Sequence, residues 1–291
     1  MNGRVYPDIM LHTQMNARWS IKNPPLATLP PRLERLIVPD KGTVWLGWDW
    51  KAMEPHLMCA LSKSAYLKDR LERNVDLHTE LMVDLFEWDK PPTLINPLKA
   101  IENTDWLAKY HIDPNNDPRR VFTKSGRFEI WYGGTGVNAA RRAARMGVSR
   151  DVGKRLLSTI YAQDSSYAVW RRGVEAGVQR THGRYYVSRT FMGRPRRILY
   201  SQGQAAIREA LNHPLQAGCR DIANCTIIAV QRVAPWLSLV WDKHDAQYWE
   251  CNEDREVETW PLITPIIEQA WDVNGWWQRF PAEYKTVRRV A

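Results

Sequence analysis

The sequence of 291 residues has little of what marks secreted, cysteine-stabilised or membrane-spanning proteins. Residues 1–20 carry charges and no apolar core of a signal peptide, and no uncharged apolar run approaches the roughly 20 residues of a membrane span. The four cysteines form no CxxC pair and no Cys/His cluster: Cys59, Cys219, Cys225 and Cys251. Neither a zinc site nor a disulfide framework is therefore indicated. These absences favour a reducing, intracellular setting.

Repeats, low-complexity tracts and a phosphate loop are also missing. Gly133-Gly134-Thr135-Gly136 lacks the Gly-Lys-Ser/Thr ending, so we interpret it as the stop of a preceding helix. Positive charge is in excess, with a net charge of +9, which suits a polyanionic partner. A solvated basic surface would have the same composition. The 15 tryptophans are expected to serve packing.

Four residues spaced four apart are the most informative feature: Arg120, Lys124, Phe128 and Tyr132, followed by Gly133. We call these four residues the ladder. In a helix each four-residue step turns the side chain only about 40° further, so the ladder would project from one face over roughly 18 Å. Its cations suit phosphate oxygens and its rings suit a sugar and a base, as in a nucleoside triphosphate. Taken alone, an amphipathic helix with a basic end is the commoner explanation.

Acidic residues follow strand-like runs on either side of the ladder. Asp49 comes near the end of VWLGWDW, with Glu54 shortly after it, and Asp245 lies within LSLVWDKHDAQYWE. Two aspartates on neighbouring strands of one sheet can share a pair of divalent cations, which is most of what phosphoryl transfer needs from side chains. A single Asp at the end of a strand is more often a turn or cap residue. The metal-binding interpretation therefore rests on the order of these motifs along the chain.

In this order the motifs resemble those of the family A DNA polymerases, and the resemblance covers nearly the whole chain. Asp49-Trp50-Lys51-Ala52-Met53-Glu54 resembles motif A, the ladder resembles motif B at every position, and His244-Asp245 resembles the centre of motif C. Asp76-Leu77-His78 resembles a motif whose His approaches the incoming triphosphate. Other positions resemble contacts to the minor groove of primer-template DNA: Arg18, Arg208, Asn212 and Gln216.

The resemblance implies an α+β fold of the right-hand polymerase type. A palm with an antiparallel sheet would carry the aspartates, and helical fingers would be inserted in it. We expect the palm at 1–65 and 206–291 and the fingers at 66–205. Strands are expected around 44–50 and 237–248 and helices from about 136 to 180, with Ser149 starting one of them.

The resemblance also implies template-directed DNA synthesis, in which a primer 3′-hydroxyl attacks a dNTP with the help of two Mg²⁺ ions. Asp49, Asp245 and the backbone carbonyl of Trp50 would hold the ions, and Lys124 would be the catalytic proton donor to pyrophosphate. The dNTP would be bound by the ladder, Glu54 and His78. Primer-template DNA would be bound by five residues: Arg18, Arg208, Asn212, Gln216 and His244.

Several positions depart from the family pattern. Ala246 stands where motif C usually has Glu, and Ala52, Pro55 and His56 replace the usual Gln and Leu-Arg of motif A. Asn16-Ala17 replaces Thr-Gly before Arg18. The chain is also longer than expected at 79–119, where loop-like stretches indicate an insertion in the fingers.

Three other functions would share part of this pattern. A single-subunit RNA polymerase would have paired aspartates and a similar helix, but Glu54 would crowd a ribose 2′-hydroxyl. A non-catalytic DNA-binding remnant need not retain Asp49, Lys124 and Asp245 together. A nuclease would have no use for the ladder, and the sequence has no clustered Asp/Glu exonuclease signature.

In the family, the thumb and any exonuclease domain precede the palm segment that here starts almost at Met1. We therefore expect one piece of a split or truncated polymerase, whose thumb and any 3′-5′ exonuclease come from a separate polypeptide. A naturally reduced enzyme that acts alone is the alternative.

Overall fold

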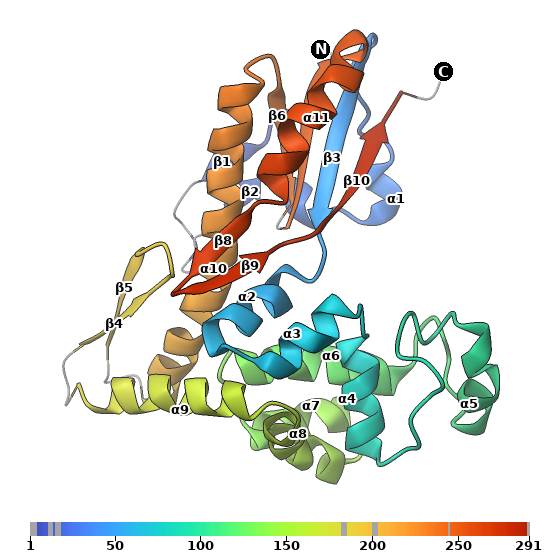
Figure 1. Cartoon of the computed structure of the whole chain (residues 1–291), viewed down its shortest axis with the longest axis vertical. Coiled ribbons are helices and arrows are strands. Elements are labelled where there is room, and N and C mark those ends of the chain that lie inside the picture. The colour runs from blue at the N-terminus through green and yellow to red at the C-terminus, as the bar shows by residue number, and fades with distance from the viewer. Residues whose placement is uncertain are drawn as a thin grey trace. The chain divides into compact units, whose positions relative to one another are not determined.

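The computed structural model describes residues 5–10, 14, 19–181, 185–199, 203–243 and 245–289. These residues belong to two compact units, each with its own core (Figure 1). The first unit comprises Met1–Leu57, Arg189–Arg194 and His213–Ala291, and the second comprises Met58–Ser188 and Pro195–Asn212. The chain therefore enters the second unit twice, at Met58 and at Pro195, and returns to the first unit each time.

A four-stranded antiparallel sheet in the order β10-β3-β7-β6 forms the centre of the first unit. Its strands are β3 (Thr43–Trp50), β6 (Ser238–Lys243), β7 (Ala246–Asn252) and β10 (Ala282–Val287). The run predicted around 44–50 is β3, whereas the run predicted around 237–248 is two strands, β6 and β7, which pair with each other across a turn. Strand β3 has a neighbour on each side and is buried over most of its length, which explains its almost continuous apolar sequence.

Alternate side chains of β3 point to opposite faces of the sheet. On one face the ring of Trp48 stacks on Trp249 with centroids 6.2 Å apart. The indole of Trp50 donates a 3.2 Å hydrogen bond to the carbonyl of Ile267 in α11 (Glu256–Ile267). On the same face Gln247 donates to the carbonyl of Ala223 in α10 (Gln204–Val233). These tryptophans serve packing, and α10 and α11 cover this face.

The other face carries a second apolar cluster. Leu26, Trp45 and Trp241 are buried in it, and Ile21 and Ile37 pack against it, so the segment before β3 covers part of this face. Asp49 alternates with Trp48 and therefore lies on this face. The remaining elements of the unit are β1 (Asp8–Met10), β2 (Ser20–Lys22), η1 (Leu26–Thr28), α1 (Pro31–Glu34), η4 (Glu253–Arg255), β8 (Ala270–Val273) and β9 (Trp276–Arg279).

The second unit is built mainly of helices. They are α3 (Ala65–Glu72), α4 (Leu77–Phe86), η2 (Ile101–Asn103), α5 (Thr104–Lys109), α6 (Pro118–Trp131), α7 (Gly136–Arg145), α8 (Arg150–Gln163) and α9 (Ser165–Gln179). Helix α2 (Met53–Ser62) leads into the unit, and β4 (Tyr185–Arg189) pairs with β5 (Pro195–Leu199). Ser149 caps α8, as predicted, because its hydroxyl accepts a hydrogen bond from the Asp151 amide.

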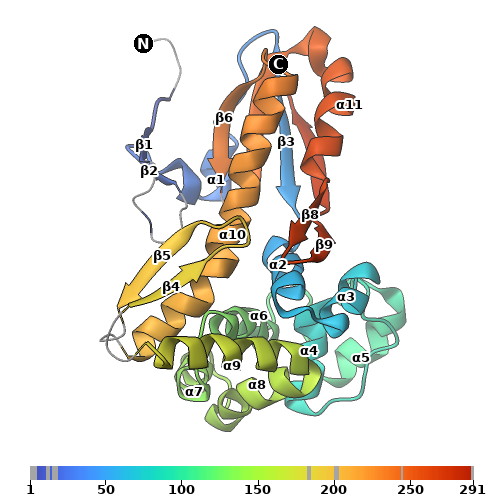
Figure 2. The same ribbon diagram turned by 60° about the vertical axis from the view of Figure 1, so that its left-hand side comes forward.

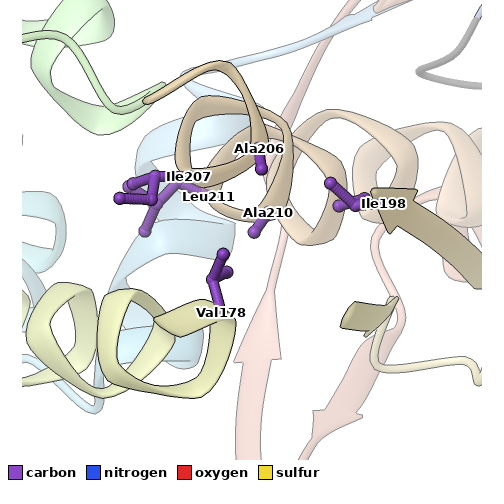
Figure 3. Packing of buried hydrophobic residues seen from close by; sticks show 6 residues of the cluster. All are labelled: Val178, Ile198, Ala206, Ile207, Ala210 and Leu211. Carbon is purple, nitrogen blue, oxygen red and sulfur yellow. The ribbon is translucent and has the colours of Figure 1, made fainter. Parts of the chain in front are cut away.

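Two apolar clusters hold the second unit together. In the first, Val178 of α9, Ile198 of β5 and Leu211 of α10 point toward one another with other residues of α10 (Figure 3). The second lies in 79–119, where Met82 and Ile112 pack with aromatic residues. There the rings of Trp88 and Tyr110 stack with centroids 4.5 Å apart. The loop-rich segment is thus ordered around its own small core.

The cysteines are free, and no helix in the described part of the chain is long and apolar enough to cross a bilayer.

Helices α7 and α8 of the second unit approach very closely (Figure 2). A Cβ atom placed on Gly153 of α8 would lie 2.5 Å from the Cα of Ala140 in α7, so only glycine fits there. Ala139, Ala140 and Ala143 of α7 are buried in consequence.

We predict that Gly153→Ala lowers the free energy of unfolding by about 1–3 kcal/mol, because the backbone of α7 must move away. Gly173 in α9 is the matched control, since a Cβ there meets nothing within 4 Å. Gly173→Ala is expected to raise the free energy of unfolding by about 0.5–1 kcal/mol. Denaturant unfolding of both variants measures the difference, and equal effects would contradict the close approach.

Candidate functional site

Asp49 and Asp245 lie at the same end of the sheet in the first unit. Asp49 is the residue before the end of β3, and its Cα partner on β7 is Ala246. The backbone amide of Trp50 donates a 3.1 Å hydrogen bond to the carbonyl of Asp245. The pairing of β3 with β7 therefore brings Asp49 close to Asp245, which lies in the turn just before β7 and not on a strand as the sequence suggested.

The electrostatics at Asp49 are unfavourable for a bare carboxylate. Partial burial raises the pKa of Asp49, and the negative charge of Asp245 raises it further. Two carboxylates that repel each other are a donor set that suits hard divalent cations, which prefer oxygen ligands. Asp49, Asp245 and the carbonyl of Trp50 thus fit the metal site predicted from the sequence. Within the described residues no three His, Cys, Asp or Glu side chains are grouped as metal ligands.

Charged residues of the neighbouring strand β10, which the sequence did not indicate, also act on Asp49. Glu283 of β10 is its direct partner in the sheet, and it raises the pKa of Asp49, whereas Lys285 and Lys243 lower it. Glu283 is itself paired with Lys51 at 2.9 Å. No motif marks β10, so only the register of the sheet reveals these residues.

The ladder begins at a well-capped helix. The carboxylate of Asp117 accepts hydrogen bonds from the amides of Arg119 and Arg120, and Pro118 occupies the first turn of α6. The helix ends at Trp131, so Tyr132 is its C-cap. Gly133 follows with φ of +86°, and a Cβ there would lie 2.8 Å from the Cα of Arg208. The glycine stop predicted from the sequence is confirmed.

The cationic half of the ladder has two different environments. Arg120 Nη2 pairs with Asp76 Oδ2 at 2.6 Å, and Asp76 also caps α4 by accepting from the amides of His78 and Thr79. Lys124 is exposed and has no ion-pair partner among the described residues. Arg120 is therefore held in place, whereas the ammonium of Lys124 is available to an anion.

The aromatic half of the ladder forms a short stack that His78 extends. The rings of Phe128 and Tyr132 are stacked with centroids 6.2 Å apart, and His78 lies 5.7 Å from Phe128. Burial lowers the pKa of His78 to about 3, and the positive charge of Arg127 contributes. His78 is therefore neutral at physiological pH and can act as a hydrogen-bonding group without adding charge.

Arg127 is the important residue of α6 that the sequence reasoning missed. Its side chain is almost completely buried, and Nη2 donates 2.7 Å to the carbonyl of Leu77 and 3.2 Å to the side chain of Gln163. It therefore ties α6 to the start of α4 and to α8. Helical spacing does not separate it from the ladder, because Arg127 follows Lys124 by three residues and Arg120 by seven, so no sequence signal marks its buried role.

The other predicted residues occupy several elements. Glu54 is buried at the start of α2 in the first unit, and Gln216 is half-buried in the part of α10 that belongs to that unit. Arg208 and Asn212 precede it in α10, within the second unit, and Arg208 is exposed. Arg18 and His244 lie outside the described residues, so their roles stay predictions.

The fold identifies the class of protein to which the chain is similar. The structure matches the polymerase domain of Pol1 from M. smegmatis, solved in complex with DNA primer-template and dNTP, with a TM-score of 0.76 and 19% sequence identity. The match covers 99% of this chain and 48% of that one. The α+β right-hand polymerase fold predicted from the sequence is confirmed.

Curated relatives agree with the fold. DNA polymerase I of Thermus filiformis is 25% identical over 91% of this chain and 31% of its own length. DNA polymerase I of Chloroflexus aurantiacus is 27% identical over 85% of this chain and 25% of its own length. The chain thus spans about a third or less of these relatives. No family model matches. The resemblance to the family A DNA polymerases, read from the motifs, is confirmed.

The raised pKa of Asp49 predicts a pH-dependent effect of its removal on stability. A carboxyl whose pKa is higher in the folded state stabilises the fold below its unfolded pKa of 3.8 and loses that contribution as the pH rises. We therefore expect Asp49→Asn to raise the thermal unfolding midpoint near pH 7 without divalent cations. The gain should shrink as the pH falls toward 4.

Asp151 on α8 is the control, because its hydrogen bond to Lys154 lowers the pKa of the Asp151 carboxyl. Asp151→Asn should bring no gain near neutral pH. Thermal scans of both variants in a chelator, over a range of pH, test the sign. A midpoint for Asp49→Asn that is unchanged or lower near pH 7 would contradict the electrostatic description.

Proposed function

We propose that this chain is the catalytic palm and fingers of a DNA-directed DNA polymerase, which extends a primer 3′-hydroxyl with dNTPs. The first unit would be the palm and the second the fingers. The observation that carries the proposal is the like-charged pair of Asp49 in β3 and Asp245 just before β7, in a chain that also has the complete ladder along α6 and its C-cap. The polymerase fold and the similarity to DNA polymerase I support it.

In the proposed reaction the palm residues hold the metal. Asp49, Asp245 and the carbonyl of Trp50 would bind two Mg²⁺ ions, which lower the pKa of the attacking hydroxyl and stabilise charge on the α-phosphate and the leaving oxygen. The raised pKa of Asp49 means that its carboxylate gains more from a nearby cation than an exposed one would. Because Ala246 stands where motif C usually has Glu, the carboxylates of the proposed metal site would be those of Asp49 and Asp245.

The ladder would bind the dNTP. Lys124, which has no competing carboxylate among the described residues, would neutralise the departing pyrophosphate and donate a proton to it. Arg120, oriented by Asp76, would contact the same phosphates. The stacked rings of Phe128 and Tyr132 would receive the sugar and base, and neutral His78 would donate a hydrogen bond without repelling the two cations.

The DNA partner is proposed from the same resemblance. Arg208, Asn212 and Gln216 are spaced four apart on α10 and would contact the minor groove of the primer-template duplex. The Oδ1 atom of Asn212 is buried and makes no hydrogen bond within the described structure. Arg18 and His244 complete the predicted contacts. The separate polypeptide with a thumb stays a prediction.

Removal of either metal-binding aspartate tests the proposal directly. Asp49→Asn or Asp245→Asn should lower primer extension with dNTPs and Mg²⁺ by about a thousandfold or more, because several kcal/mol of transition-state stabilisation are lost. DNA affinity should change little. The exposed Asp151→Asn is the control and should extend primers normally. Normal extension by either active-site variant would refute the metal assignment.

Glu54 is proposed to exclude ribonucleotides, together with Tyr132. The buried carboxylate of Glu54 would occupy the space of a ribose 2′-hydroxyl, so Glu54→Ala should raise the ratio of ribonucleotide to dNTP incorporation by about tenfold or more. Single-nucleotide incorporation with matched dNTP and NTP measures the ratio. If this ratio is unchanged in Glu54→Ala, another residue excludes the ribonucleotides.

The phenylalanine at position 128 leads us to predict resistance to dideoxynucleotide chain terminators. It lacks the hydroxyl with which a Tyr at this family position compensates for a missing 3′-hydroxyl, so the natural chain should reject dideoxynucleotides. Phe128→Tyr should raise dideoxynucleotide incorporation by about tenfold or more, the value of one added hydrogen bond to a charged group. Incorporation of the matching dNTP is the internal control. Efficient termination by the unmodified chain would contradict the alignment of the ladder.

A further inference from the structure

A buried ion pair lies close to the turn that carries Asp245. Arg220 of α10 and Asp242 of β6 are joined through Nη1 and Oδ2 at 2.5 Å, and their side chains are only 2% and 4% exposed. Both residues belong to the first unit, where α10 runs beside β6 (Figure 2). No motif marks either residue, and the proposed reaction uses neither of them.

The pair lies at the base of the turn between β6 and β7. Asp242 faces Gln247 in the register of these strands, and Asp245 lies in the short segment between the two. The side-chain amide of Gln247 donates a 3.4 Å hydrogen bond to Oδ1 of Asp242 and a 3.2 Å hydrogen bond to the carbonyl of Ala223 in α10. Both strands that lead into the turn are therefore attached to α10.

Further contacts hold the end of β6 on both faces of the sheet. Successive side chains of a strand point to opposite faces, so Lys243 points away from α10. It forms an ion pair with Glu34 of α1. On the α10 side, the guanidinium of Arg220 also lies over the ring of Trp19, with Cζ 4.3 Å from the ring centroid. The base of the turn is thus fixed from two directions.

A buried ion pair is an inefficient way to stabilise a fold. The cost of removing two charges from water cancels most of their attraction, so well-packed apolar residues of similar volume are often as stable or more stable. What the pair provides is direction, because a planar guanidinium binds a carboxylate in a defined geometry. Asp245 raises the pKa of Asp49 by repulsion, so the turn that carries it needs a contact that resists displacement.

We propose that the ion pair of Arg220 with Asp242 positions the metal ligand Asp245 for the reaction. This inference rests on the proposed function. The two are positioning residues, because they act through the backbone of the turn and not on the substrate. Gln216 lies one helical turn before Arg220 in α10, so the pair also attaches the turn to a helix that carries a predicted DNA contact.

The first test replaces the pair by apolar residues of similar size in the full chain. Arg220→Met/Asp242→Leu should leave the free energy of unfolding in denaturant unchanged or higher. The kcat for incorporation of a single nucleotide should fall by about 10- to 100-fold, since a displacement of about 1 Å in an active site can cost about 100-fold. The KM for the dNTP should be unchanged, because the ladder belongs to the second unit. A merely structural pair would not separate kcat from stability in this way.

A second readout does not depend on activity. Mn²⁺ alone is titrated into the full chain, without DNA or dNTP, and free Mn²⁺ is measured by electron paramagnetic resonance. Arg220→Met/Asp242→Leu should weaken Mn²⁺ binding by about tenfold, and Asp245→Asn shows the effect of losing the ligand itself. A stable double variant with normal kcat and normal Mn²⁺ affinity would overturn the proposal.

A matched pair of single substitutions decides the question if the double variant does not fold. Asp221 follows Arg220 in α10 and is also a buried carboxylate bound to an arginine, but its partners are Arg194 and Thr190 and not the hairpin of β6 and β7. Asp242→Asn and Asp221→Asn should both lower the free energy of unfolding. Only Asp242→Asn should also lower kcat and Mn²⁺ affinity, and equal losses in the two variants would reject the positioning role.

The outcome is separable from that of the proposed function, because primer extension is measured first on the unmodified chain. A chain that fails to extend primers but loses Mn²⁺ affinity in Arg220→Met/Asp242→Leu would retain the positioning role and reject the polymerase assignment. A chain that extends primers equally well with and without the ion pair would do the reverse.

Discussion

The first unit depends on the antiparallel pairing of β3 with β7. This pairing sets Asp49 against Ala246 and joins the backbone of Trp50 to Asp245, so two carboxylates are held at one end of the sheet despite their repulsion. Packing in the rest of the unit offsets the free energy that this repulsion costs. Trp48 and Trp50 are packed beneath α10 and α11, and Gln247 is bonded to the backbone of α10. A rigid strand end is what a metal site needs, since ligands that could move apart would relieve the repulsion without a cation.

In the second unit, positively charged side chains are held close together by fixed contacts. Arg127 is buried in α6 and binds the carbonyl at the start of α4, while Arg120 binds the carboxylate that caps the same helix. These contacts fix α6 and α4 relative to each other within the unit, and they also concentrate cations near His78. Burial, with a contribution from these cations, lowers the pKa of His78, so its imidazole is neutral, and Lys124 is the exposed cation of the ladder.

Much of this could be predicted from the sequence, because the polymerase motifs are local. The spacing of Arg120, Lys124, Phe128 and Tyr132 predicted one face of a helix, and Gly133 predicted its end. The strands around Asp49 and Asp245 were predicted from apolar runs. What could not be predicted depends on contacts between distant parts of the chain. Glu283 becomes a neighbour of Asp49 only through the register of β10, and Arg127 is buried only because Leu77 and Gln163 meet it.

The position of β3 in its sheet has a consequence for the order of folding. Both of its partners, β7 and β10, come from the far end of the sequence, whereas the helices of the second unit are made largely of contacts close in sequence. During synthesis the strand that contains Asp49 must wait, unpaired and apolar, until β7 and β10 have left the ribosome. The helical unit can form first. An apolar strand that waits unpaired for β7 and β10 is exposed to aggregation until they form.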